Sequence, residues 1–113
     1  MICVNMRENK TGRICLSVTG HANADSIGKD IICASASTLV YTIAQMVKNY
    51  YEMGALECPP KIILKSGRSN VTCIPKKDYY EEVRYAYLVV QTGLNLLARN
   101  YPEYVSLTCF DEV

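Results

Sequence analysis

The pattern of apolar and polar positions divides the first half of the chain into two strands and a long helix. Apolar and polar residues alternate over residues 1–7 and again over 13–19, and the turn-forming residues 8–12 between them predict an antiparallel hairpin. From about Asp30 to Tyr51 the apolar residues recur at helical spacing. The predicted apolar stripe of this helix is Ile32, Leu39, Ile43, Met46, Val47 and Tyr50.

The second half repeats the order of two strands and a helix and adds a final strand. Gly54 and Pro59-Pro60 end the first helix, and a second hairpin pairs 61–65 with 70–74 through residues 66–69. Asp78 and Glu81 have the spacing of a capping pair and predict a second helix that reaches Tyr101. Its stripe is Val83, Ala86, Tyr87, Val90, Leu94 and Leu97.

A last strand is predicted over residues 104–110. The order β-β-α-β-β-α-β indicates an α+β fold in which two helices pack on one face of a mainly antiparallel sheet. At 113 residues the chain is long enough for one hydrophobic core, so residues 1–113 are expected to form a single domain.

The segment from Gly20 to Cys33 places the chain's single histidine, His21, at the end of a predicted strand. Cys33 falls in the first turn of the predicted helix, where unpaired backbone N–H groups and the helix dipole favour a thiolate. A thiolate is the form of cysteine that attacks an acyl carbon, and a nearby imidazole accepts its proton. The spacing therefore predicts a cysteine nucleophile with a histidine base.

Asp30 has two candidate roles in this segment. As an N-cap it would accept the backbone N–H of Cys33, and as a third catalytic residue it would orient His21. The residues between strand and helix, 22–29, are small or polar and include Gly28, so they are expected to form a loop that brings His21 beside Cys33.

The residues 20–37 resemble the ribosomal-processing cysteine protease family, Prp. The resemblance rests on Gly-His-Ala at 20–22, Gly-x-Asp-Ile-x-Cys-Ala at 28–34, and Ser37 four residues after the cysteine. It implies that Cys33 is the nucleophile, that His21 is its base, and that Asp30 and Ser37 assist. Substrate contacts are expected at the other motif positions, which are Gly20, Ala22, Gly28, Ile31 and Ala34.

The resemblance also implies a substrate and an assembly state. Members of the family remove an N-terminal extension, after aromatic residues, from ribosomal protein twenty-seven of the large subunit, and relatives occur in prophages. A homodimer is implied as well. Exposed sheet edges and a tyrosine-rich surface support that expectation, the tyrosines being Tyr50, Tyr51, Tyr79, Tyr80, Tyr85 and Tyr87.

The remaining cysteines favour a structural interpretation. Cys3, Cys15, Cys58, Cys73 and Cys109 have no histidine or C-x-x-C neighbour, so neither a zinc site nor any other cofactor is expected. Six cysteines without a visible signal peptide or transmembrane span predict free thiols in the cytoplasm and no membrane partner. The net charge of +1 predicts no direct contact with nucleic acid.

Three alternatives to the ribosomal protease stay open at this point. A prophage-type relative would process a phage head protein, and a ribosome-associated interaction domain would use Cys33 for no chemistry. A redox or acyl-carrier thiol would be modified reversibly without peptide cleavage, although no second cysteine lies near Cys33 in sequence.

Overall fold

The computed structural model describes the backbone of residues 1–21 and 26–109 and the side chains of residues 1–21 and 31–107. Its elements, in chain order, are β1 (Ile2–Glu8), β2 (Ile14–Thr19), α1 (Ser26–Glu52), β3 (Lys61–Lys65), β4 (Arg68–Cys73), a 3-10 turn (Lys77–Tyr79), α2 (Tyr80–Asn100) and β5 (Val105–Cys109). This order confirms the predicted α+β fold.

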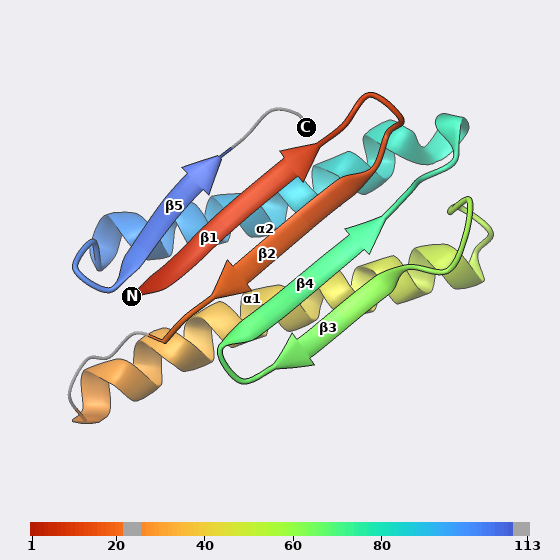
Figure 1. Ribbon diagram of the computed structural model, residues 1–113. Coiled ribbons are helices and arrows are strands. Elements are labelled where there is room, and N and C mark those ends of the chain that lie inside the picture. The colour runs from red at the N-terminus through yellow and green to blue at the C-terminus, as the bar shows by residue number, and fades with distance from the viewer. Residues whose placement is uncertain (22–25, 110–113) are drawn as a thin grey trace.

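The five strands form one sheet in the order β3-β4-β2-β1-β5. Three of the four neighbouring pairs are antiparallel, and β5 alone runs parallel to its neighbour β1. Both helices lie side by side on the same face of the sheet (Figure 1), as predicted. The parallel pair arises because α2 carries the chain back along the sheet before β5 begins.

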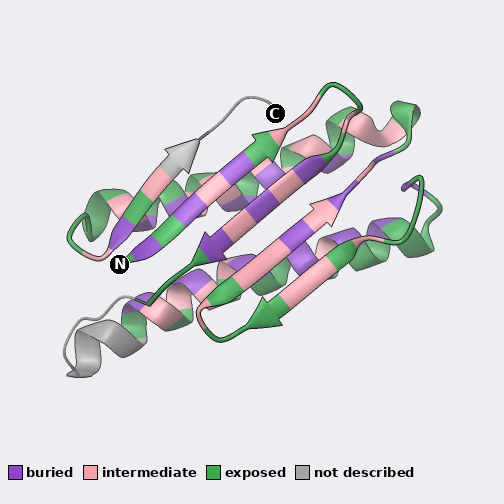
Figure 2. Ribbon diagram, viewed as in Figure 1, coloured by how far each residue is buried: buried purple, intermediate pink, exposed green. Residues whose placement is uncertain are grey.

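Alternation along the strands separates a core face from an uncovered face. Ile2, Val4 and Met6 of β1 are buried under the helices, whereas Cys3 and Arg7 are exposed on the other side. The same alternation is seen along β2 and β4 (Figure 2). Because no described helix covers the second face, its side chains are mostly polar and partly exposed.

The core is completed by the inner faces of the two helices. The predicted stripe of α2 is buried except for the half-buried Ala86. In α1, Leu39 and Met46 are half-buried rather than central, and the small residues Ala36 and Ala44 are buried in the core. A Cβ placed on Gly93 of α2 would lie 2.8 Å from a Leu39 methyl carbon, so the two helices approach closely at that point.

The predicted start of the first helix is wrong. Helix α1 begins at Ser26, four residues before Asp30, so residues 26–29 are helical and not part of a loop. Gly28 lowers helix stability by about 1 kcal/mol relative to Ala, a cost that a helix of 27 residues tolerates. Residues 22–25, the rest of the expected loop, lie outside the described residues.

The capping pair predicted for the second helix is also absent. Asp78 lies in the 3-10 turn, and α2 follows Tyr79, which makes no side-chain capping hydrogen bond. The backbone closes this start instead: the Tyr79 N–H donates to the Lys76 carbonyl over 2.9 Å. In a 3-10 turn, backbone carbonyls accept hydrogen bonds from N–H groups that would otherwise donate to a capping side chain.

Two of the tyrosines that were expected on an interaction surface are buried instead. Tyr50 and Tyr87 belong to the core, so they do not contribute to an interaction surface, whereas Tyr51 and Tyr85 are exposed. Among the cysteines with described side chains, Cys73 alone is fully buried. Cys3 and Cys58 are exposed and Cys15 is half-buried.

By length and composition, the segment Ile31–Glu52 of α1 meets the requirements for a membrane-spanning helix. Runs of consecutive apolar residues did not indicate such a segment, because small and hydroxyl residues interrupt them. In the apolar 18-residue window of this segment, 33% is buried in the fold, and the core helix of a soluble protein meets the same criterion.

Candidate active site

Cys33 and His21 line the same cavity, which has a volume of about 180 Å³. The cavity lies where the end of β2, one face of α1 and the turn between β3 and β4 meet. Cys33 is half-buried and packs partly against the core, and His21 is exposed. The structure therefore brings together the two residues that the sequence predicted as nucleophile and base.

The α1 side of the cavity follows from helical spacing. Ser37 and Tyr41 lie one and two turns after Cys33, on the same face, and both line the cavity. Ala36 and Val40, each one residue before these two, face the core and form the apolar wall on the α1 side of the cavity. Ser37 therefore lies on the helix face that carries Cys33.

The backbone of His21 is fixed from two sides. Its carbonyl accepts a hydrogen bond from the Met1 nitrogen over 2.5 Å, and the N–H of the preceding Gly20 donates to the Gly67 carbonyl over 2.9 Å. Gly20 has a φ of +88°, and a Cβ there would lie 2.2 Å from the Met1 carbonyl oxygen. The first position of the motif therefore requires glycine because the backbone of Met1 approaches it closely.

Gly67, in the turn between β3 and β4, makes room for the imidazole. It has a φ of +74°, and a Cβ at this position would lie 2.6 Å from Nε2 of His21. Glycine is thus needed both for the backbone conformation and for the histidine side chain. The sequence identified residues 66–69 as a turn but did not connect that turn with His21.

The same turn adds two cations to the cavity. Lys65 and Arg68 line it together with Leu64, Ser66 and Ser69. Sequence analysis missed these residues because their proximity depends on β4 pairing with β2, which places the turn beside the end of β2. Positive charge stabilises a thiolate, so this side of the cavity is electrostatically suited to the proposed nucleophile.

The helix dipole does not supply the effect that the sequence predicted. Since α1 begins at Ser26, Cys33 lies about two turns inside the helix, where its N–H is used within the helix. Asp30 is internal to α1 and is therefore not its N-cap. The orientation of the Asp30 side chain lies outside the described residues.

The other predicted substrate-binding positions are placed as follows. Gly20 lines the cavity, Gly28 lies inside α1, and Ala22 lies outside the described residues. Ile31 and Ala34 are exposed on α1 and do not line the cavity. In the described part of the chain, no group of three or more His, Cys, Asp or Glu side chains is arranged to hold a metal ion.

Comparison with known proteins identifies the family. The model of the cysteine protease Prp family matches residues 1–106, nearly the whole chain. This chain belongs to the Prp family of cysteine proteases. The enzyme class is therefore cysteine protease, and the cavity around Cys33 is its candidate active site.

Solved structures show the same fold. The ribosomal processing protease Prp from S. aureus, in complex with a covalently linked product peptide, has a TM-score of 0.74 and 21% identity, covering 97% of this chain and 100% of that one. The protein SMU.848 from Streptococcus mutans has a TM-score of 0.72 and 26% identity, covering 99% and 96%.

A second S. aureus Prp structure contains a substrate peptide and has a TM-score of 0.69 and 20% identity, covering 97% of this chain and 100% of that chain. No curated protein matches the sequence. The likeness to the S. aureus enzyme establishes the architecture of this chain.

Proposed function

We propose that this protein is a cysteine endopeptidase that removes the N-terminal extension of ribosomal protein twenty-seven of the large subunit, with Cys33 as nucleophile and His21 as general base and acid. The observation that carries the proposal is the shared cavity of Cys33 and His21 in a chain of the Prp family. The S. aureus relative, named as a ribosomal processing protease, supports the choice of substrate.

In the proposed reaction, His21 accepts the thiol proton and the sulfur of Cys33 attacks the scissile carbonyl carbon. The C–N bond breaks as His21 returns the proton to the leaving amine, which leaves a thioester on Cys33. Water, deprotonated by His21, then hydrolyses the thioester and releases the free thiol. Atoms and charge balance with water as the sole co-reactant.

Oxyanion stabilisation is assigned to the turn between β3 and β4 rather than to the helix start. Residues 66–68 of this turn line the cavity together with the cation Lys65, and Arg68 adds a second cation. Charges and oriented N–H groups near a developing oxyanion typically lower the barrier by a few kcal/mol. Asp30 is proposed to orient His21, and Ser37 to hydrogen-bond substrate or water.

Substrate selection is proposed to depend on the apolar side of the cavity. Tyr41 is 56% exposed and Leu64 is 39% exposed, and both line the cavity with Val40. An aromatic substrate residue next to the scissile bond would cover these two side chains and remove their apolar surface from water. This arrangement supports cleavage after aromatic residues.

The test is incubation with a synthetic peptide that carries the aromatic-rich extension, analysed by mass spectrometry. One cut directly after the aromatic residues is expected, chelators leave the rate unchanged, and a reducing agent is needed to keep Cys33 free. A parallel peptide from a phage head protein distinguishes the prophage alternative, and cleavage of that peptide alone would replace the ribosomal substrate. No cleavage of either peptide would favour the interaction-domain alternative.

The biological setting belongs to the same proposal. A protease that acts on a ribosomal protein works in the cytoplasm, where its thiols stay reduced. A homodimer is proposed on the basis of the two sheet edges, β3 and β5, together with the exposed Tyr51 and Tyr85. Sedimentation equilibrium at micromolar concentration measures this directly, and a monomer would contradict it.

A further inference from the structure

A second and larger hollow lies on the face of the sheet that the helices leave uncovered. Its volume is about 590 Å³, and it is lined by residues of β1, β2, β3 and β4 together with Cys58 and Pro59. It shares Arg68 and Ser69 with the cavity around Cys33 and extends away from that cavity across the sheet.

The floor of this hollow is an ordered polar network. The Asn70 side-chain amide donates to the Ser17 hydroxyl over 2.9 Å and to the Cys15 sulfur over 3.2 Å. The Thr72 hydroxyl donates to the Asn70 carbonyl oxygen over 2.6 Å. These contacts use both N–H donors of the Asn70 amide and hold the side chains of Ser17 and Thr72 in fixed positions on adjacent strands. A ligand therefore meets a preorganised polar surface.

Cations surround this floor. Arg7, Arg13, Lys61 and Arg68 all line the hollow, all are exposed, and none takes part in an ion pair among the described residues. Strand register places Arg7 opposite Cys15, Cys15 opposite Thr72, and Thr72 opposite Lys61. Arg7 and Lys61 therefore end a row across four strands, which at ordinary strand spacing separates their backbones by about 14 Å.

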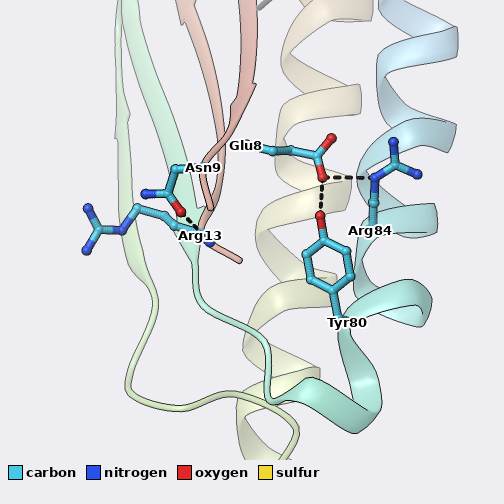
Figure 3. A network of polar contacts seen from close by, with 5 residues as sticks. All are labelled: Glu8, Asn9, Arg13, Tyr80 and Arg84. Atoms are coloured by element: carbon cyan, nitrogen blue, oxygen red, sulfur yellow. Dashed lines mark hydrogen bonds and ion pairs between the residues drawn. The ribbon is translucent and has the colours of Figure 1, made fainter. Parts of the chain in front are cut away.

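The acidic residue that lines the hollow, Glu8, forms an ion pair with Arg84 of α2. Its carboxylate accepts hydrogen bonds from the Tyr80 hydroxyl and, over 2.8 Å, from Nε of Arg84, both on α2 (Figure 3). Burial and the bond to Glu8 raise the pKa of Tyr80 to about 12, so the tyrosine remains a donor at neutral pH. The side chain of Arg13 points away from Glu8 in the same view (Figure 3).

We propose that this face binds double-helical RNA through its phosphates and 2′-hydroxyl groups. Duplex RNA is recognised mainly by such contacts, and unpaired cations around a fixed polar floor that contains the hydroxyl groups of Ser17 and Thr72 provide them. The lining contains no aromatic side chain on which unpaired bases would stack. Its apolar side chains, such as Pro59, Ile63 and Ile74, are too few for the apolar centre of a protein interface.

The proposal departs from the expectation based on net charge. The chain has 12 basic and 11 acidic residues, a near-balance that describes the molecule as a whole. Four of the basic residues gather around one hollow whose acid is paired elsewhere, so this face is cationic although the protein is almost neutral. Local potential, rather than total charge, determines where a polyanion binds.

The experiment measures binding of the full chain to a labelled RNA duplex of about 20 base pairs and arbitrary sequence, between about 50 and 200 mM salt. With four phosphate contacts, the logarithm of the affinity should fall with the logarithm of salt concentration with a slope of about −3 to −4. The triple variant R7Q/R13Q/K61Q should reduce the slope to about −1, since each lost contact removes about one.

A matched control removes three exposed cations elsewhere. The variant K48Q/K77Q/R99Q changes net charge equally but alters α1, α2 and the 3-10 turn, so it should bind RNA like the unmodified chain. Peptide cleavage should be unchanged in R7Q/R13Q/K61Q, because these residues lie outside the cavity around Cys33. Arg68 is left unmodified because it also lines the cavity around Cys33.

Three results would overturn the proposal. These are absence of binding at about 100 µM protein in the lowest salt, equal losses in the two triple variants, and tighter binding to polyglutamate than to RNA. The last result would identify an acidic protein as the partner. None of them depends on peptidase activity, so this proposal fails or stands separately from the proposed function.

Discussion

Two thiols of this chain, Cys33 and Cys73, lie in opposite kinds of surroundings. Cys73 of β4 is 3% exposed on the face of the sheet that the helices cover, and its sulfur accepts a hydrogen bond from the Tyr87 hydroxyl over 3.6 Å. Burial raises the pKa of the Cys73 thiol to about 11, although that hydrogen bond opposes the shift. Cys33 is half-buried in a cavity that contains His21, Lys65 and Arg68.

The difference shows that the position in the fold, and not the residue type, decides which cysteine can react. Each residue follows or precedes an isoleucine in the sequence, and both contact the core. A buried thiol without a base or a solvent path remains protonated and packs as a small apolar side chain. A thiol at the edge of the same core, with an imidazole and two cations in its cavity, meets the requirements for a nucleophile.

The largest expected effect on activity comes from removing the Cys33 thiol, and removal of the Cys73 thiol is the comparison. Cys33→Ala should lower kcat/KM for the extension peptide by at least about 1,000-fold, and His21→Ala should do the same, because nucleophile and base act as a unit. Cys73→Ala should leave kcat/KM within about twofold while lowering the free energy of unfolding by about 1 kcal/mol. Retained cleavage in Cys33→Ala would remove the basis of the comparison.

Alkylation kinetics measure the same contrast without a substrate. In native protein at about pH 7.5, iodoacetamide should label Cys33 at least about 100-fold faster than Cys73, since a thiol of high pKa is almost entirely protonated and Cys73 is also shielded. Cys3 and Cys58, which are exposed, serve as internal references in peptide mapping. Labelling of Cys33 no faster than these two would show that the cavity does not activate it.

Gly67→Ala tests whether the turn between β3 and β4 positions the His21 imidazole. The new Cβ would displace the His21 imidazole, so kcat/KM should fall by about 10- to 100-fold. Gly54→Ala is a matched control, because Gly54 has a φ of +80° and no atom within 4 Å of a Cβ. Both variants should lose comparable stability from backbone strain, as measured by urea unfolding. Equal losses of activity would show that strain alone is responsible.

The last expected effect concerns stability alone, through its dependence on alkaline pH. The folded state raises the pKa of Cys73 above its ordinary value of 9.0, so it favours the protonated thiol. The resulting stabilisation is present below about pH 9 and is lost as pH rises to about 11, by at most about 2 to 3 kcal/mol. Chemical unfolding of the native chain and Cys73→Ala at these pH values isolates the contribution of Cys73 from that of the tyrosines.

Much of the fold follows from local pattern. Alternation in β1 and β2 and the helical spacing of Val83, Tyr87 and Val90 determine which side chains face the core, because strands and helices have fixed periods. The starts of the two helices differ from the prediction for a physical reason. Gly28 weakens a helix without ending it, and backbone bonds replaced the expected Asp78 cap, so α1 and α2 begin where sequence signals did not place them.

The sequence by itself determined the candidate pair, Cys33 and His21, since the motif spacing and the strand that precedes His21 are local features. Tertiary structure alone decided what surrounds the pair. The pairing of β4 with β2 brings Gly67, Lys65 and Arg68 to a histidine more than forty residues earlier in the chain. The same pairing assembles cations from β1, β3, β4 and the turn between β1 and β2 on the uncovered face. Such contacts depend on strand order, which local periodicity does not encode.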